Sequence, residues 1–128
     1  MSLLDVRAGI KTVLTTIQGL RVYDFQTDGP EVPAAIVGFP DTIDPHAVFG
    51  DGTDYVIPVG LLISRATDRS ADTQMVELVE AIVAALDDDP TLDGACDSVN
   101  VIEVANFTYG DVGTTPVMVC EVRVQVMA

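Results

Sequence analysis

The chain is 128 residues long, which is the size of one ordinary domain and enough to bury a hydrophobic core without disulfide or metal support. Twenty acids against six Lys and Arg residues give a formal net charge of −14, which repels phosphate backbones and argues against direct, specific binding of DNA or RNA. Hydrophobic residues make up 48% of the chain, so we expect more apolar surface than a monomer can hide, and hence a homo-oligomer.

The acidic charge is concentrated in the second half of the chain. Residues 1–70 hold five bases and nine acids, a net charge of −4, whereas residues 71–128 hold one base and eleven acids, a net charge of −10. Solubility is one explanation of this charge, and functional repulsion of a polyanion is the other.

The sequence favours a cytoplasmic protein. No apolar run reaches the roughly 18–20 residues needed to cross a bilayer, and the N-terminus lacks the basic-then-apolar pattern of a signal peptide. Because nothing points to secretion, we expect Cys96 and Cys120 to be free, buried thiols.

A helix is predicted to begin almost at the first residue. Ser2 and Asp5 have the spacing of a capping box, and Gly19 is expected to end the helix. Arg7 and Lys11, one turn apart, lie outside its apolar stripe and are expected to face solvent or an acidic neighbour. The stripe consists of Leu3, Val6, Ile10, Val13, Leu14 and Ile17.

Three predicted strands follow the helix. Residues 20–25 and 34–39 form two short strand-like segments between turn residues. Residues 55–64 predict a third strand, in which Pro58 suggests an edge or a bulge because proline cannot donate a ladder hydrogen bond. Residues 40–54 have neither helical nor strand periodicity, and loops of this length usually bind, cover or assemble something.

The next predicted element is a second core helix. Ser70 is its expected N-cap, and a wide apolar stripe runs from Met75 to Leu86. Three consecutive carboxylates then open residues 87–94, but consecutive side chains do not converge on one ion. We therefore expect a turn that Asp89 caps, rather than a metal site.

The last two segments, residues 98–109 and 116–127, are strand-like and predict a hairpin; in the second, Val122, Val124 and Val126 alternate with polar residues. The order α-β-β-β-α-β-β then predicts an α+β domain over residues 1–128, with two helices packed on one face of a mixed, mainly antiparallel five-stranded sheet. A crossover from residues 55–64 to 98–109 would bring at least one parallel pairing. Apolar residues on both faces of these strands need a further cover, for which another subunit is the economical candidate.

Catalytic chemistry has little support in the sequence. His46 is the one histidine of the chain, and no Ser, Cys or Lys lies at a spacing that would place it in a dyad. The turn sequences at 50–52 and 110–113 lack the helix and the lysine of a phosphate-binding loop. We expect no enzyme, no cofactor and no metal site.

Four segments, spread over residues 1–104, stand out together: MSLLDVRAGIKTVLTTIQGLRVYDF, PEVPAAIVGFP, FGDGTDYVIPVGLLISRATDRSADTQMVELVEAI and DDDPTLDGACDSVNVIEV. In the order of its elements and in local phrases such as VPAAIVG and RATDR, the chain resembles the tail terminator and head–tail connector (minor tail) proteins of long-tailed bacteriophages and prophages, particularly those of actinobacterial phages. The resemblance implies an α+β structural protein without enzymatic activity. It also implies a ring, commonly hexameric, that caps the tail tube and joins it to the head-completion or connector proteins.

The implied location is the host cytoplasm during assembly and then the tail or neck of the virion. DNA would pass through the bore of the ring, where acidic walls would keep it from sticking. The loop at residues 40–54 is then interpreted as an assembly element rather than an active site. A head-closure or neck connector protein is one alternative, and a small monomeric α+β ligand-binding domain or enzyme is another. The candidate assembly and partner-binding residues are Pro45, His46, Phe49, Asp51, Arg65 and Arg69.

Overall fold

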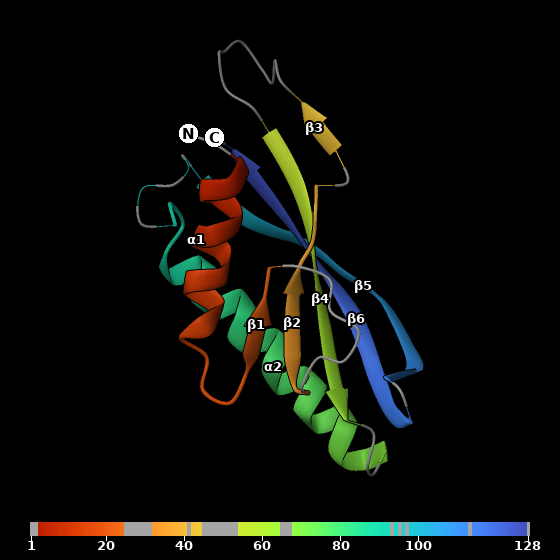
Figure 1. The fold of residues 1–128 in the computed structure, drawn as a ribbon. Helices are drawn as coiled ribbons and strands as arrows, with labels where there is room; N and C mark the ends of the chain where they lie inside the picture. The colour runs from red at the N-terminus through yellow and green to blue at the C-terminus, as the bar shows by residue number, and fades with distance from the viewer. Residues whose placement is uncertain are drawn as a thin grey trace.

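The computed structural model describes residues 3–24, 32–40, 42–44, 54–64, 68–92, 94, 96, 98–112 and 114–127 (Figure 1). Its elements in chain order are α1 (Leu3–Thr15), β1 (Arg21–Tyr23), β2 (Ala34–Val37), β3 (Thr42–Asp44), β4 (Asp54–Ser64), α2 (Asp68–Asp88), β5 (Ser98–Val112) and β6 (Thr115–Met127). The predicted α+β class, the two helices and the five predicted strands are confirmed, and the short strand β3 is an addition to them. None of the described helices is both long and apolar enough to span a membrane.

The main path of the sheet runs β1-β2-β4-β6-β5, and β3 pairs with β4 beside this path. The β1–β2 pair is parallel, and the other pairs are antiparallel. The expected parallel pairing across the β4–α2–β5 crossover is wrong, because β6 lies between the two strands. The physical reason is burial: β6 is the more apolar strand of the hairpin and takes the centre, while the more polar β5 takes the edge.

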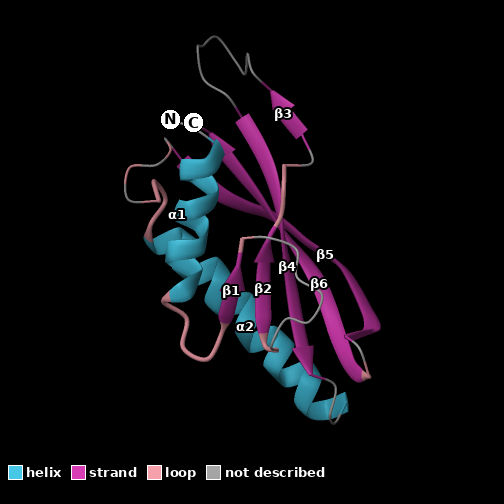
Figure 2. Ribbon diagram, in the orientation of Figure 1, coloured by secondary structure: helices cyan, strands magenta, loops and turns pink. Residues whose placement is uncertain are grey.

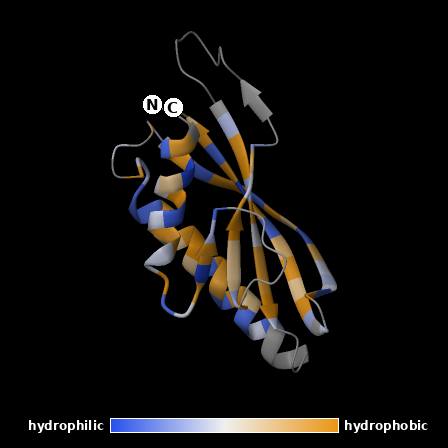
Figure 3. Ribbon diagram, in the orientation of Figure 1, coloured by the Kyte–Doolittle hydropathy of each residue, from blue (hydrophilic) through white to orange (hydrophobic). Residues whose placement is uncertain are grey.

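Both helices pack on one face of the sheet (Figure 2). Every second residue of β4 from Tyr55 to Ile63 and of β6 from Cys120 to Val126 faces them, as the register of the two strands requires. Hydrophobic residues accordingly run along the central strands (Figure 3). The helices contribute the predicted stripes, and both cysteines are free and buried. The helix residues of this core are Val6, Ile10, Val13, Leu14, Met75, Ile82 and Leu86.

Pro58 does not mark an edge or a bulge of β4, contrary to the sequence expectation. The strand is central, and Pro58 stays in register opposite Arg123. In an antiparallel ladder the N and O of a residue face the same neighbour, and the O of Pro58 accepts a hydrogen bond from the N–H of Gly38 at 2.9 Å. Since β2 has ended at Val37, the missing N–H of the proline interrupts no ladder hydrogen bond.

The helix ends differ slightly from the expected ones. The α1 helix ends at Thr15 and continues as turns to Gly19, whose φ of 83° is the left-handed value expected of a glycine after a helix. The α2 helix begins at Asp68, so Ser70 lies within its first turn and not at the N-cap position. The predicted turn after α2 is present, with the Leu92 N–H bonded to the Asp89 O at 3.1 Å.

Arg7 is buried rather than solvated, which corrects the sequence expectation. Its Nε donates to the O of Gly38 at 3.0 Å, and its Nη2 donates to the O of Val37 at 2.9 Å and of Asp24 at 2.6 Å. Its guanidinium carbon lies 4.5 Å from the centre of the Phe39 ring. Strands β1 and β2 end at these carbonyls, which need donors once the ladder stops, and Arg7 supplies them.

Lys11 has the acidic neighbour that was predicted. Its Nζ lies 3.8 Å from Oδ1 of Asp24, and both side chains are about two-fifths exposed. Such an exposed ion pair contributes little to stability. Together, Arg7 and Lys11 nevertheless fix one side of α1 against the ends of β1 and β2.

Candidate functional site

The predicted assembly residues lie almost entirely outside the described part of the chain. Pro45, His46, Phe49, Asp51 and Arg65 belong to segments that the structure does not describe. Arg69 lies in the first turn of α2, but its side chain is not described. The assembly role of these six residues stays a prediction. Part of the long loop does have regular structure, because residues 42–44 form β3 against β4.

The sheet face opposite the helices carries a second set of apolar residues. Ala34, Ile36 and Val117 are buried but lie outside the main core cluster. The register explains why: Ile36 pairs with Gly60 and Ala34 with Leu62, and these positions alternate with the core positions of β2 and β4. The sheet therefore has apolar residues on both faces: the main core lies on the face that the helices cover, and the smaller second set lies on the outer face.

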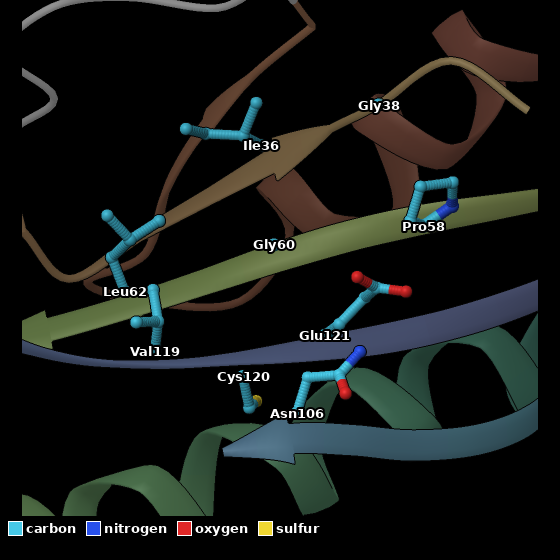
Figure 4. Close-up of a pocket in the computed structure, with 9 residues that line it drawn as sticks. All are labelled: Ile36, Gly38, Pro58, Gly60, Leu62, Asn106, Val119, Cys120 and Glu121. Atoms are coloured by element: carbon cyan, nitrogen blue, oxygen red, sulfur yellow. The ribbon is translucent and has the colours of Figure 1, made fainter. Parts of the chain in front are cut away.

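A groove of about 410 Å³ lies across this outer face, over four strands (Figure 4). Figure 4 shows Leu62 and Val119 toward one end and Gly38 and Pro58 toward the other. The residues that line the groove are Ile36, Gly38, Pro58, Gly60, Leu62, Asn106, Val119, Cys120 and Glu121.

Gly60 leaves the middle of the groove open. A Cβ built there meets only the O of Ile36, at 4.0 Å, so the fold itself does not require a glycine. Gly38 differs, because a Cβ at that position would lie 2.9 Å from the O of Pro58. The two glycines therefore do different things: Gly38 allows β2 and β4 to approach closely, whereas Gly60 keeps the groove hollow.

The polar groups of the groove lie on β5 and β6. Glu121 accepts a hydrogen bond from Nη1 of Arg123 at 2.9 Å, and both side chains are less than one-third exposed. Asn106 lies at a bulge of β5 with a φ of 60°, a left-handed value that asparagine tolerates better than most residues. The ends of this groove are therefore apolar and one flank is polar, a composition suited to holding a side chain or a small molecule.

Cys120 lines the groove, but its thiol is directed into the core. Its Sγ lies 3.5 Å from Sδ of Met75. Burial raises the pKa of this thiol to about 11, so it is protonated at neutral pH and is a poor nucleophile. Glu121 is then the one charged side chain among the described groove residues. In the described part of the chain, no three His, Cys, Asp or Glu residues lie together as metal ligands would.

A second uncovered feature is the edge strand β5. Among the described residues β5 pairs with β6 alone, and the register shifts between Val101 and Glu103 and between Ala105 and Thr108. These bulges leave Ile102, Asn106 and Phe107 without partners on β6. Bulges commonly protect an edge strand, but here they coincide with exposed apolar side chains. Three large hydrophobic side chains of the strand are at least half exposed: Ile102 (50%), Phe107 (51%) and Tyr109 (60%).

Sequence reasoning did not find the groove or the β5 edge. The groove needs the register of four strands, which no local pattern gives. One signal for the edge was available: the alternation of apolar and polar residues breaks at Ile102 and again at Phe107.

No model of a known protein family matches this chain, and a search of curated proteins finds no significant match.

Proposed function

We propose that this chain is a structural protein of phage morphogenesis, a tail terminator. Its oligomeric ring caps the tail tube and joins it to the head-completion or connector proteins. The protein assembles in the host cytoplasm and becomes part of the tail or neck of the virion. A head-closure or neck connector is the neighbouring role, because both kinds of ring stack on another ring.

The observation that carries this proposal is the exposed apolar surface among the described residues. The outer face of the sheet has a groove with apolar ends, and the β5 edge exposes Ile102, Phe107 and Tyr109. A ring subunit needs surfaces for its two neighbours and for an adjoining ring. An enzyme would instead need converging catalytic groups, and the described groove residues offer Glu121 beside an inert Cys120 thiol.

The net charge of −14 supports the same role. A bore that DNA passes through without sticking benefits from negative walls. The α2 helix carries six acids and Arg69 as its one base, and Asp72, Glu77 and Glu80 are exposed along it. This acidic helix is the element best suited to line such a bore.

The test is the native mass of the chain, followed by its effect on tail tubes. Light scattering over a range of concentrations is expected to reveal a species near six times 13.6 kDa, with a central hole in electron micrographs. Added to purified tail tubes that lack a terminator, the chain should bind at one tube end and stop further elongation. Failure to bind tube ends at any concentration would rule out the terminator role.

One observation favours a second candidate, a small ligand-binding domain. The groove of about 410 Å³ falls within the roughly 300–1,000 Å³ of small-molecule sites. A monomer whose unfolding temperature rises with a small ligand, and whose groove variant Gly60→Leu loses that rise, would support this candidate over the ring.

A further inference from the structure

We infer that neighbouring copies of this chain contact one another head to tail, with the β5 edge of one copy against the α1 edge of the next. This inference deepens the proposed function, because that function supplies the ring and the inference names the surfaces that join its subunits. The β5 edge is defined here as the exposed side of residues 102–111. The α1 edge is defined as the side of α1 that carries Leu4 and Lys11, together with the adjoining side chain of Phe39.

The α1 edge has a defined composition. Leu4, Arg7 and Lys11 follow one another at three- and four-residue spacing and so share one side of the helix. Arg7 is bonded to Asp24 and Lys11 is paired with it, which places this side over the end of β1. Arg7 also contacts the ring of Phe39. Leu4 and Phe39 are the two most exposed large hydrophobic residues described, at 74% and 73%.

The two edges lie at opposite ends of the sheet. Strand β1 is terminal on one side of the path and β5 on the other, and α1 contacts β1 and β2. Two different surfaces at opposite ends of a subunit are what a head-to-tail interface requires, and a head-to-tail interface closes into a ring when the rotation allows.

The charges of the two edges are complementary. On the α1 edge and the adjoining β1, the three bases Arg7, Lys11 and Arg21 outnumber the one acid, Asp24; Arg7 is buried and Lys11 is paired with Asp24, whereas Arg21 is exposed. The hairpin at 98–127 contains three acids and one base, a net charge of −2, and Glu103 and Asp111 are exposed on β5. Among the described residues, the α1 edge therefore has a small excess of bases that complements the acidic β5 edge.

The two edges also match in length. From Ile102 to Tyr109 an extended strand covers about 23 Å. The 13 residues of α1 span about 20 Å. A contact about 20 Å long and about 10 Å wide, the width of one helix, covers roughly 200 Å² on each copy, well below the ~800 Å² per partner of a standard interface. Each contact is therefore weak, and closure of the ring stabilises the assembly.

Two variants, each defective at one edge, test the inference. Ile102→Lys with Phe107→Lys places positive charge on the β5 edge, facing the basic α1 edge. Leu4→Glu with Lys11→Glu places negative charge on the α1 edge, facing the acidic β5 edge. All four side chains are at least partly exposed, so both variants should fold, which circular dichroism and the unfolding midpoint would check. The matched controls are Thr12→Lys and Thr12→Glu, at an exposed position of α1 outside the Leu4–Lys11 stripe.

The decisive measurement is the native mass of each variant alone and of the two mixed. The wild-type chain and the Thr12 controls should associate with rising concentration, while each edge variant alone should associate at least tenfold more weakly. An equimolar mixture should associate at least tenfold more strongly than either variant alone, because each variant keeps the edge that the other has lost. A mixture that associates no more strongly than the separate variants, or a wild-type chain that is monomeric at every concentration, overturns the inference.

Two further outcomes separate this contact from the proposed function. Self-association of the Leu4→Glu, Lys11→Glu variant would mean that β5 pairs with β5 in a symmetric contact, which overturns the head-to-tail arrangement. Rings that persist in both edge variants would overturn the inference while the terminator role stands. The role itself is decided separately, by the binding of the chain to tail-tube ends.

Discussion

Replacing Arg7 with methionine is expected to lower the free energy of unfolding by about 3 kcal/mol. The side chain is buried, and three hydrogen bonds of 2.6–3.0 Å join it to the carbonyls of Gly38, Val37 and Asp24. A hydrogen bond to a charged group contributes about 1.5–3 kcal/mol, and an acceptor left unsatisfied costs about 1–3 kcal/mol. The expected loss is smaller than the sum over three hydrogen bonds, because methionine keeps the apolar packing and does not require a charge to be desolvated.

Arg7→Lys should lose less, about 2 kcal/mol, since an ammonium keeps the charge but cannot reach all three carbonyls with the planar geometry of a guanidinium. Lys11→Met is the matched control on the same helix side. Its ion pair with Asp24 is 3.8 Å long and exposed, and such pairs contribute about 0–1 kcal/mol.

Urea unfolding measures these differences in the free energy of unfolding. The protein concentration should be low enough that the native mass is that of one chain. For a domain of this size each kcal/mol corresponds to about 4 °C in Tm, so Arg7→Met should lower Tm by roughly 12 °C. A loss for Arg7→Met within about 1 kcal/mol of the loss for Lys11→Met would refute the view that Arg7 closes the ends of β1 and β2.

Two further predictions concern the groove and the buried thiol. Gly60→Val should leave stability unchanged or raise it by up to about 1 kcal/mol, because its Cβ meets no close neighbour and valine favours strands. Urea unfolding checks this, and a loss above about 1 kcal/mol would mean that the groove is filled within the fold. The folded pKa of Cys120, about 11, lies above its ordinary value of 9.0, so the unfolded chain loses this proton first and stability should fall as pH rises from 9 to 11. A Cys120→Ala variant should lack this decline, and an equal decline in both proteins would contradict the assignment.

The core was predictable because its pattern is local. Alternation along β4 and β6 and the helical spacing in α1 and α2 assign each apolar residue to a face without knowledge of the partner strands. The same reasoning could not give the order of the strands. It favoured a pairing of β4 with β5, whereas the more apolar β6 lies between them. The exposed side chains Ile102 and Phe107 interrupt the pattern at bulges, whose positions depend on the pairing with β6.

Arg7 shows a second limit of sequence reasoning. On the helix surface it has the spacing of an ordinary solvated residue, and its burial depends on where β1 and β2 happen to end. The groove has the same origin, since Ile36, Gly60 and Glu121 become neighbours only when the strands are in register. Features that depend on contacts between residues far apart in the sequence could therefore not be predicted from local patterns. The candidate residues of the long loop, among them His46, lie outside the described part of the chain and stay predictions.

The uneven charge of the sequence gives the two ends of the sheet different charges. The first 24 residues carry the bases Arg7, Lys11 and Arg21, and they form α1 and the β1 edge of the sheet. Six acids lie on α2, and Glu103 and Asp111 are exposed on β5, at the opposite end of the sheet from β1. A uniform negative charge would oppose every contact between copies. With bases at one end of the sheet and acids at the other, the repulsion is weaker when the β1 end of one copy meets the β5 end of another. In the proposed ring, this arrangement would keep an acidic surface toward a passing polyanion while it favours the inferred head-to-tail contact.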